Sequence, residues 1–297
     1  MARRVKREGA IVGDVNATSY FLPNDEPADA TTHTTDAELR VVATRATASP
    51  WSAATQHGGP PAALLTHLLE QQALPEGQTI ARISFDLLGP VPLGPLSARA
   101  SVLRPGRSVQ LLEATLRDES SGRDVLVARA WCAPDFSGGP TLGLPAEAAG
   151  AAPSAPGAGE IHDAPPAWGR GYMDSVDWRW LTGSIRELGP AVCWVRPRPE
   201  LLPGVPLSPR ARLMTAVDSS SGVSAALDIA HWDFLNTDLT VHLLREPVGE
   251  WICLDAQTSV AGGAVGVASA RIFDEHGLVA TTAQSLLINQ RESERRH

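Results

Sequence analysis

A single carboxylate breaks an apolar stretch in the second half of the chain. Residues 214–228 read MTAVDSSSGVSAALD, and Asp218 follows residues that have the composition of a buried helix. An unpaired buried carboxylate is costly, because burial disfavours its charged form. Two roles explain an Asp at this place. It is either a cap for a helix that continues through the serines or a general base in a cleft.

The run His57-Gly58-Gly59 is the second group of residues suited to chemistry, and it opens a helix that we predict over residues 57–72. Glycines let the backbone approach a ligand closely, and a helix N-terminus presents N–H groups with a favourable dipole. The two prolines that follow suit a first helical turn but have no N–H to donate. The pattern predicts an oxyanion site at these glycines, and a simple turn before a helix is the alternative.

Each of these helices is followed by strand-like segments that end in Gly, Pro or Asp. In the first half the predicted strands are 81–91, 95–106, 108–118 and 124–134, and in the second half they are 238–248, 250–261, 264–277 and 278–288. The same order of helix and strands therefore occurs twice.

The two halves also align residue by residue. SVQLLEATLRDESSG (108–122) lies against GAVGVASARIFDEHG (263–277), and Asp118 and Asp274 are 156 residues apart. Two copies of about 130 residues, each a helix followed by a mostly antiparallel sheet, predict the α+β class, because a helix buries its apolar stripe by lying across its sheet.

The domain limits follow from composition. We expect an N-terminal repeat over residues 1–136, a Gly-, Pro- and Ala-rich linker over 137–165 and a C-terminal repeat over 166–297. The residues after the linker, up to Trp194, are rich in tryptophan and are predicted to form the opening strands of the second repeat.

The bulk composition excludes several classes of protein. The net charge is −8, without the clustered Lys and Arg that nucleic-acid binding requires. No apolar run has the ~18 residues or more of a membrane span, and the N-terminus lacks the apolar core of a signal peptide. Cys132, Cys193 and Cys253 lie far apart without metal or redox spacing. They are predicted to be reduced thiols in a cytoplasmic protein.

The order of these motifs resembles the acyl-CoA thioesterase II family, which has the double hot dog fold. The resemblance is carried by QHGGPPAALL before the first sheet, AVDSSSGVSAALD in the second helix, NTDLTVHLLREPVGEW after it and DEHGLVATTAQSLLI at the end. It covers about residues 45–136 and 205–289. It implies two repeats, each a curved sheet wrapped around a helix, and an acyl-CoA or acyl-carrier thioester as substrate.

The resemblance also implies a set of catalytic residues. In that family an Asp, a Gln and a Thr hold the water that attacks the thioester carbonyl. Asp218 matches the Asp of the second helix, and Gln284 matches the Gln of the last strand. At the Thr position this sequence departs from the pattern and has Asn236, with Thr237 beside it. Either side chain can hydrogen-bond a water.

Structural roles also explain these positions. Gln284 fits a solvent-facing strand residue, and Asn236 fits a turn residue. The resemblance implies a hydrolase without a metal or other cofactor, and family behaviour implies a homo-oligomer.

Two other functions remain as alternatives to a thioesterase. One is a hot dog hydratase or dehydratase, in which His57 pairs with Asp218. The other is a non-catalytic protein that binds a CoA- or carrier-linked acyl chain. Gln284 discriminates, because a thioesterase needs it and a dehydratase does not.

Overall fold

A computed structural model describes residues 17–24, 38–135, 152–163 and 170–291. The first repeat comprises β1 (Phe21–Pro23), β2 (Leu39–Ala43), η1 (Arg45–Thr47), α1 (Gly59–Glu70), β3 (Gln78–Leu87), β4 (Pro95–Arg104), β5 (Gln110–Asp118) and β6 (Arg123–Pro134). The second comprises η2 (Pro156–Ala158), α3 (Tyr172–Ser175), β7 (Val176–Thr182), β8 (Ala191–Pro197), α4 (Pro209–Val217), α5 (Ser220–Val223), β9 (Trp232–Asn236), β10 (Asp238–Leu243), β11 (Ile252–Val260), β12 (Val265–Asp274) and β13 (Gly277–Gln290).

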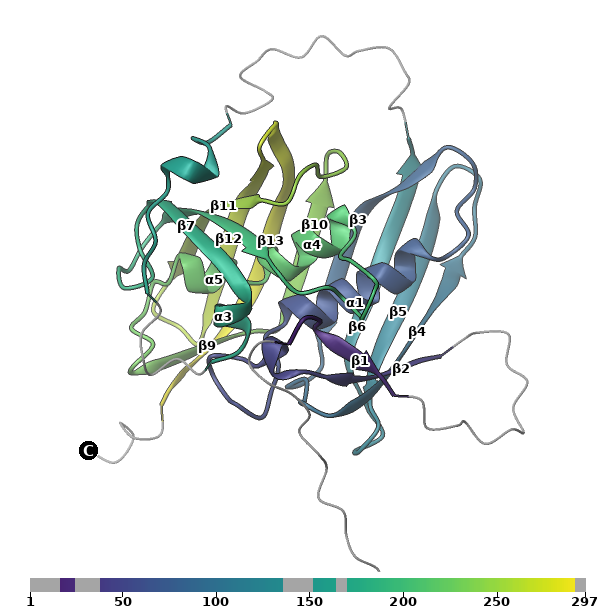
Figure 1. The fold of residues 1–297 in the computed structure, drawn as a ribbon, viewed down its shortest axis with the longest axis horizontal. Helices are drawn as coiled ribbons and strands as arrows, with labels where there is room; N and C mark the ends of the chain where they lie inside the picture. The colour runs from purple at the N-terminus through teal and green to yellow at the C-terminus, as the bar shows by residue number, and fades with distance from the viewer. Residues whose placement is uncertain (1–16, 25–37, 136–151, 164–169, 292–297) are drawn as a thin grey trace, which may run out of the picture.

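All strands of the described part form one 13-stranded sheet, as Figure 1 shows. Its order is β1-β2-β4-β5-β6-β3-β10-β13-β12-β11-β8-β7, and β9 pairs with the end of β13. From either end of the sheet, corresponding strands of the two repeats follow in the same order, and β3 and β10 meet at the centre. The prediction of two like repeats, each with a helix and a mostly antiparallel sheet, is confirmed, and the two sheets join into one.

The central pair β3 and β10 joins the two repeats by an antiparallel ladder. Phe85 lies opposite Leu239, and Ile83 lies opposite Val241. All four of these side chains are buried. The sheet of one repeat thus continues into the sheet of the other. Because the halves share one core, they cannot separate without exposing it.

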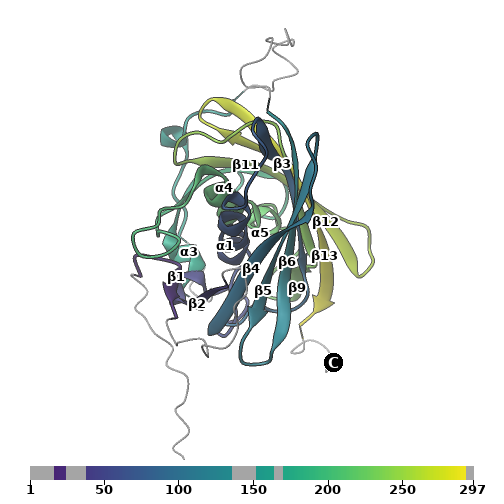
Figure 2. The same ribbon diagram turned by 90° about the vertical axis from the view of Figure 1, so that its right-hand side faces the viewer.

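The two long helices pack against each other on the inner face of the curved sheet (Figure 2). The start of α1 lies against the last turn of α4 at Thr215, and the start of α4 bonds the end of α1, where the Ser208 hydroxyl donates to Glu70 at 2.6 Å. The helices are therefore antiparallel. Almost every residue of α1 is buried, as expected for a helix that is apolar all round.

The second helix differs from the prediction over residues 214–228. Helix α4 begins earlier, at Pro209, with Ser208 as its N-cap, and it ends at Val217. A separate short helix, α5, follows, and residues 225–231 are not helical. The prediction of one continuous helix was wrong, because the chain turns at Asp218 and Ser219, two residues of weak helix propensity.

Other expectations concern the ends of the repeats. The tryptophan-rich stretch forms β7 and β8, as predicted, although Trp168 lies outside the described residues. The expected linker 137–165 also falls largely outside them. Its described part packs onto the second repeat, where the Trp194 indole N–H donates to the carbonyl of Ser154 at 2.7 Å.

The three cysteines are free thiols and all are buried. No helix in the described part of the chain is long and apolar enough to cross a membrane.

Candidate active site

Asp218 lies at the C-terminal end of α4, in the junction before α5. Its side chain is about 6% exposed. One carboxylate oxygen, Oδ1, accepts a hydrogen bond of 2.7 Å from Asn236 Nδ2. The other, Oδ2, lies 3.2 Å from His57 Nδ1. The carboxylate is thus buried and paired from two distant segments, and it does not cap α5, whose first turn has no side-chain cap.

Asn236 reaches Asp218 because the chain bends between β9 and β10. Both strands pair with β13: Asn236 lies opposite Leu286, whereas Thr240 lies opposite Ala283. The side-chain amide of Asn236 is held from both ends, because its Oδ1 accepts the Ser221 hydroxyl at 3.4 Å while its Nδ2 donates to Asp218. A turn residue facing solvent would not make these contacts.

Thr237 lies apart from this group. Its side chain is exposed, and its hydroxyl is 3.4 Å from the Ser285 carbonyl and 3.5 Å from Asp238 Oδ1. Of the two residues considered for the third position, the structure brings only Asn236 to the carboxylate.

Gln284 faces the inside of the sheet and is about 1% exposed. Its Nε2 donates to the backbone carbonyl of Asp218 at 3.4 Å, and its Oε1 accepts the backbone N–H of Ser221 at 3.2 Å. Gln284 therefore fixes the turn between α4 and α5 that carries the carboxylate. Sequence reasoning did not single out Ser221, although the serine run after Asp218 was a visible signal.

The glycines at the start of α1 lie directly against the carboxylate. A Cβ at Gly58 would be 2.8 Å from both carboxylate oxygens of Asp218, and a Cβ at Gly59 would be 2.2 Å from the carbonyl oxygen of Thr215. Real Cβ atoms do not tolerate such contacts, so no other residue fits either position without a shift. The glycine pair permits the closest approach of α1 and α4.

His57 is held by a second aromatic ring. The imidazole stacks on Tyr172 of α3, with ring centroids 3.7 Å apart and planes 5° from parallel. The Tyr172 hydroxyl donates to the carbonyl of Thr215 at 2.7 Å. No sequence signal marked Tyr172, because its contact with His57 spans the two repeats. Burial lowers the pKa of His57, partly opposed by the Asp218 carboxylate, so the ring is neutral at neutral pH.

The single proton of a neutral imidazole constrains this arrangement. The Gly59 N–H lies 3.1 Å from His57 Nδ1, the same atom that lies 3.2 Å from Asp218. Nδ1 can donate to an ionised carboxylate or accept from Gly59, but not both. The Gly59 N–H is placed to donate to Nδ1. The Gly58 N–H has no acceptor among the described residues.

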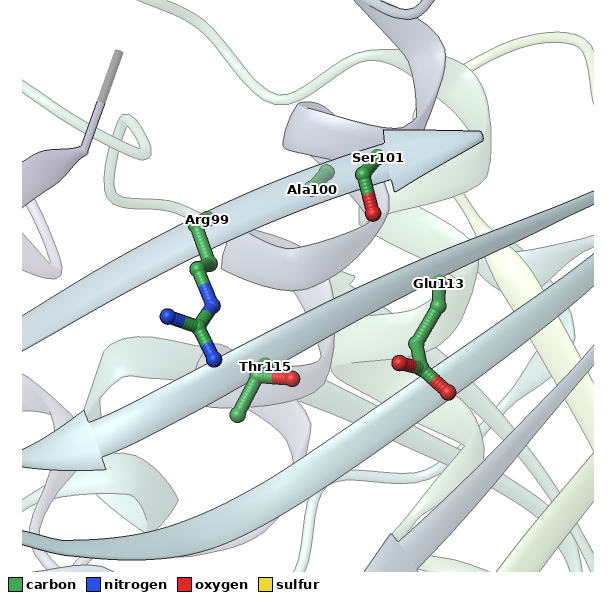
Figure 3. Close-up of a pocket in the computed structure, with 5 residues that line it drawn as sticks. All are labelled: Arg99, Ala100, Ser101, Glu113 and Thr115. Carbon is green, nitrogen blue, oxygen red and sulfur yellow. The ribbon is translucent and has the colours of Figure 1, made fainter. Parts of the chain in front are cut away.

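A shallow depression on the outer face of the sheet is unrelated to this group. It has a volume of about 290 Å³ and lies over β4 and β5, as Figure 3 shows. Its polar lining comprises Arg99, Ser101, Glu113 and Thr115. Glu113 is already paired with Arg129 at 2.8 Å. These side chains form a solvated surface on the face opposite to the helices.

No three His, Cys, Asp or Glu side chains within the described ranges are arranged to hold a metal ion.

Two sequence models of acyl-CoA thioesterases match the chain. The N-terminal domain matches residues 47–133, and the C-terminal domain matches residues 150–288. Together the two domains span most of the sequence, in the order expected from the duplication. Among curated proteins, none is similar to this chain by sequence.

Solved structures share the fold. A candidate thioesterase II from Thermobifida fusca YX has a TM-score of 0.65 and 20% identity, covering 85% of this chain and 92% of that one. A hot dog protein of unknown function from Alicyclobacillus acidocaldarius has a TM-score of 0.65 and 17% identity, with 87% and 95% covered. Acyl-CoA thioesterase II TesB2 from Mycobacterium marinum has a TM-score of 0.57 and 18% identity, with 86% and 92% covered.

At these identities the structural likeness shows the fold, and the two domain matches show the family. The chain belongs to the acyl-CoA thioesterase family of thioester hydrolases and has the double hot dog fold.

Proposed function

We propose that the chain hydrolyses acyl-CoA thioesters by attack of water, with Asp218 as general base. The observation that carries this proposal is the convergence on one buried carboxylate. The Asn236 amide bonds the carboxylate itself at 2.7 Å, and the Gln284 amide holds the backbone of the same residue. Capping a helix needs neither contact.

The carboxylate is prepared to accept a proton. An ionised carboxylate can accept about four hydrogen bonds; Asn236 supplies one, and His57 Nδ1 lies 3.2 Å from the other oxygen. A water molecule at a remaining position would donate one hydrogen to Asp218 and direct its lone pair toward the thioester carbon. The neutral Asn236 amide orients the carboxylate without competing for that proton, and the Gln284 amide fixes the backbone that carries it.

The start of α1 supplies the polarising groups. The Gly58 amide has no acceptor among the described residues and lies at a helix N-terminus next to the carboxylate, whereas the Gly59 amide donates to His57 Nδ1 at 3.1 Å. Backbone N–H groups in such a position stabilise the oxyanion of a tetrahedral intermediate.

The reaction balances with these groups alone. The water oxygen bonds to the carbonyl carbon while its proton passes to Asp218, which gives a tetrahedral oxyanion. The C–S bond then breaks as the carbonyl re-forms, and the leaving thiolate takes the proton. The products are a carboxylic acid and a free thiol.

Substitution of Asp218 by Asn tests the proposal. The change keeps the shape of the side chain and removes the base, and general-base assistance is worth roughly 100- to 10,000-fold. We expect thiol release from acyl-CoA to fall by about that factor, with the circular dichroism spectrum preserved. Asp228→Asn is the matched control, because Asp228 is an exposed carboxylate of the same repeat. Equal rates for folded wild type and Asp218→Asn would refute the mechanism.

The pairing of His57 with Asp218 at 3.2 Å favours a hot dog hydratase or dehydratase as the second candidate. A 3-hydroxyacyl-CoA substrate separates the two functions. A thioesterase releases free thiol from it, whereas a dehydratase forms the conjugated enoyl thioester, with its own ultraviolet absorbance, and releases no thiol. The same assay with a carrier-protein thioester tests which thiol the enzyme accepts.

We further propose that the protein is a cytoplasmic homo-oligomer. The three buried free thiols support a reducing compartment. Light scattering tests the assembly, and a monomer would contradict it.

A further inference from the structure

A small apolar cluster lies beside the candidate site and is separate from the main core. We call it the distal cluster. Its four buried members are Phe234, Ala268, Leu286 and Ile288, and the partly buried side chains packed on them are Trp51, Ala225, Leu227, Trp232 and Val260. The main core of the protein contains none of these residues.

The distal cluster continues directly from the catalytic group along two strands. On β13 the inward-facing positions run from Gln284 to Leu286 and Ile288. On β9 the residue opposite Leu286 is Asn236, and the residue opposite Ile288 is Phe234. Side chains two residues apart on a strand share a face and are about 7 Å apart. The cluster therefore begins where the polar site ends.

Hydrogen-bonded polar side chains line one side of the distal cluster. Gln284 lies opposite Ala268 in the ladder between β12 and β13. Near it the Ser224 hydroxyl is 2.9 Å from the Thr258 hydroxyl, two positions along β11 from Val260. An apolar cluster beside a polar site suits a ligand with a polar head and an apolar tail.

Loops from both repeats cover the distal cluster. Trp51 comes from the first repeat, six residues before His57, and its ring meets the Phe234 ring edge-on, with centroids 4.9 Å apart and planes at 85°. Leu227 comes from the segment after α5. Trp51 remains partly exposed, with the Arg291 guanidinium 5.6 Å from its ring centroid. Trp51 and Leu227, which both come from loops, thus form part of the cover.

We propose that the distal cluster binds the acyl chain of the thioester and that Trp51 and Phe234 limit its length. This inference rests on the proposed function. With the carbonyl carbon at Asp218, an acyl chain that follows the inner face past Asn236 meets Phe234 after about 7 Å. The buried members are tightly packed, none more than 6% exposed, so the chain makes room by displacing Trp51. The geometry predicts a preference for short acyl groups.

The test compares chain-length profiles. Wild type, Trp51→Ala and Phe234→Ala are assayed for kcat/KM on straight-chain substrates from acetyl-CoA to dodecanoyl-CoA. Each methylene that becomes buried adds roughly fourfold to kcat/KM. We expect wild type to favour short chains, and the ratio of decanoyl- to butyryl-CoA activity to rise at least about 10-fold in both variants.

The matched control is Phe273→Ala. Phe273 is as buried as Phe234 and lies in the same repeat, but it belongs to a different apolar cluster, with Trp194 and Cys253. Its truncation lowers stability without changing the chain-length profile. If Phe234→Ala does not fold, Phe234→Leu and the partly exposed Trp51→Ala still test the inference.

The outcomes separate the two proposals. Unchanged profiles in Trp51→Ala and in the folded Phe234 variant, with active wild type, overturn the acyl-binding inference and leave the hydrolase intact. A wild type that already prefers long chains also overturns it. A wild type that hydrolyses no thioester of any length refutes the proposed function itself.

Discussion

At the scale of single residues, the lack of a side chain at Gly58 makes room for the Asp218 carboxylate. Gly58 presses its backbone against both carboxylate oxygens, where a Cβ would be 2.8 Å away. Asn236 and His57 contact the same two oxygens from other directions. The carboxylate is therefore confined to one orientation, which is what a base that must meet a bound water requires.

Gly58→Ala is expected to reduce thioester hydrolysis by on the order of 100-fold, because the methyl group forces the carboxylate away from Asn236. The measurement is kcat/KM for acyl-CoA, with thermal unfolding to establish that the variant folds. Gly89→Ala is the control, since a Cβ there would meet nothing within 4 Å. Full activity in Gly58→Ala would show that the carboxylate orientation is not critical.

At the scale of elements, two interruptions of regular structure create the site. Helix α4 stops at Val217, so that Asp218 stands at a helix end beside the start of α1. The strand after it bends between β9 and β10, which both pair with β13. Because neighbouring strand residues point to opposite faces, this bend decides which of Asn236 and Thr237 faces inward.

The bend predicts different effects on activity for substitutions of Asn236 and Thr237. Asn236→Ala removes a donor to the buried carboxylate and leaves the Ser221 hydroxyl without its acceptor, a loss of about 1–3 kcal/mol. We expect its kcat to fall roughly 5- to 150-fold by that conversion, while Thr237→Ala, with its exposed side chain, keeps wild-type activity. Steady-state kinetics on the two variants decides the matter, and a larger loss in Thr237→Ala would reverse the assignment.

At the scale of the whole molecule, the pseudo-symmetry creates two comparable positions, and we propose that only the one at Asp218 is catalytic. The antiparallel helices bring the start of α4 to the end of α1, just as they bring Gly58 to Asp218. There the Glu70 carboxylate accepts from Ser208 at 2.6 Å and pairs with Arg210, which also donates to Thr79 at 2.6 Å. This position is closed by an ion pair.

One acyl-CoA per chain is the expected stoichiometry. Titration calorimetry of an acyl-CoA into Asp218→Asn should show a single site. Arg210→Met should lower the free energy of unfolding by about 1–3 kcal/mol, while its kcat stays near the wild-type value. Chemical denaturation measures the second effect. Two equal sites, or loss of activity in Arg210→Met, would show that the second position also functions.

The sequence alone determined the features that local pattern and repetition encode. Asp118 and Asp274, 156 residues apart, occupy the ends of the equivalent strands β5 and β12, because strand length and turn residues are written locally. The start of α1 could likewise be predicted from its glycines and prolines. Asp218 stood out as a carboxylate in an apolar run, since a buried polar residue needs a reason, whereas Gln284 was found only through the resemblance to a known family.

Only the tertiary structure decided which side chains meet. The choice of Asn236 over Thr237 depends on how the bend between β9 and β10 is paired with β13, and that pairing is long-range. The stacking of Tyr172 on His57 and of Trp51 against Phe234 joins segments from different repeats. Such contacts are selected by packing of the whole core, so no local sequence pattern contains them.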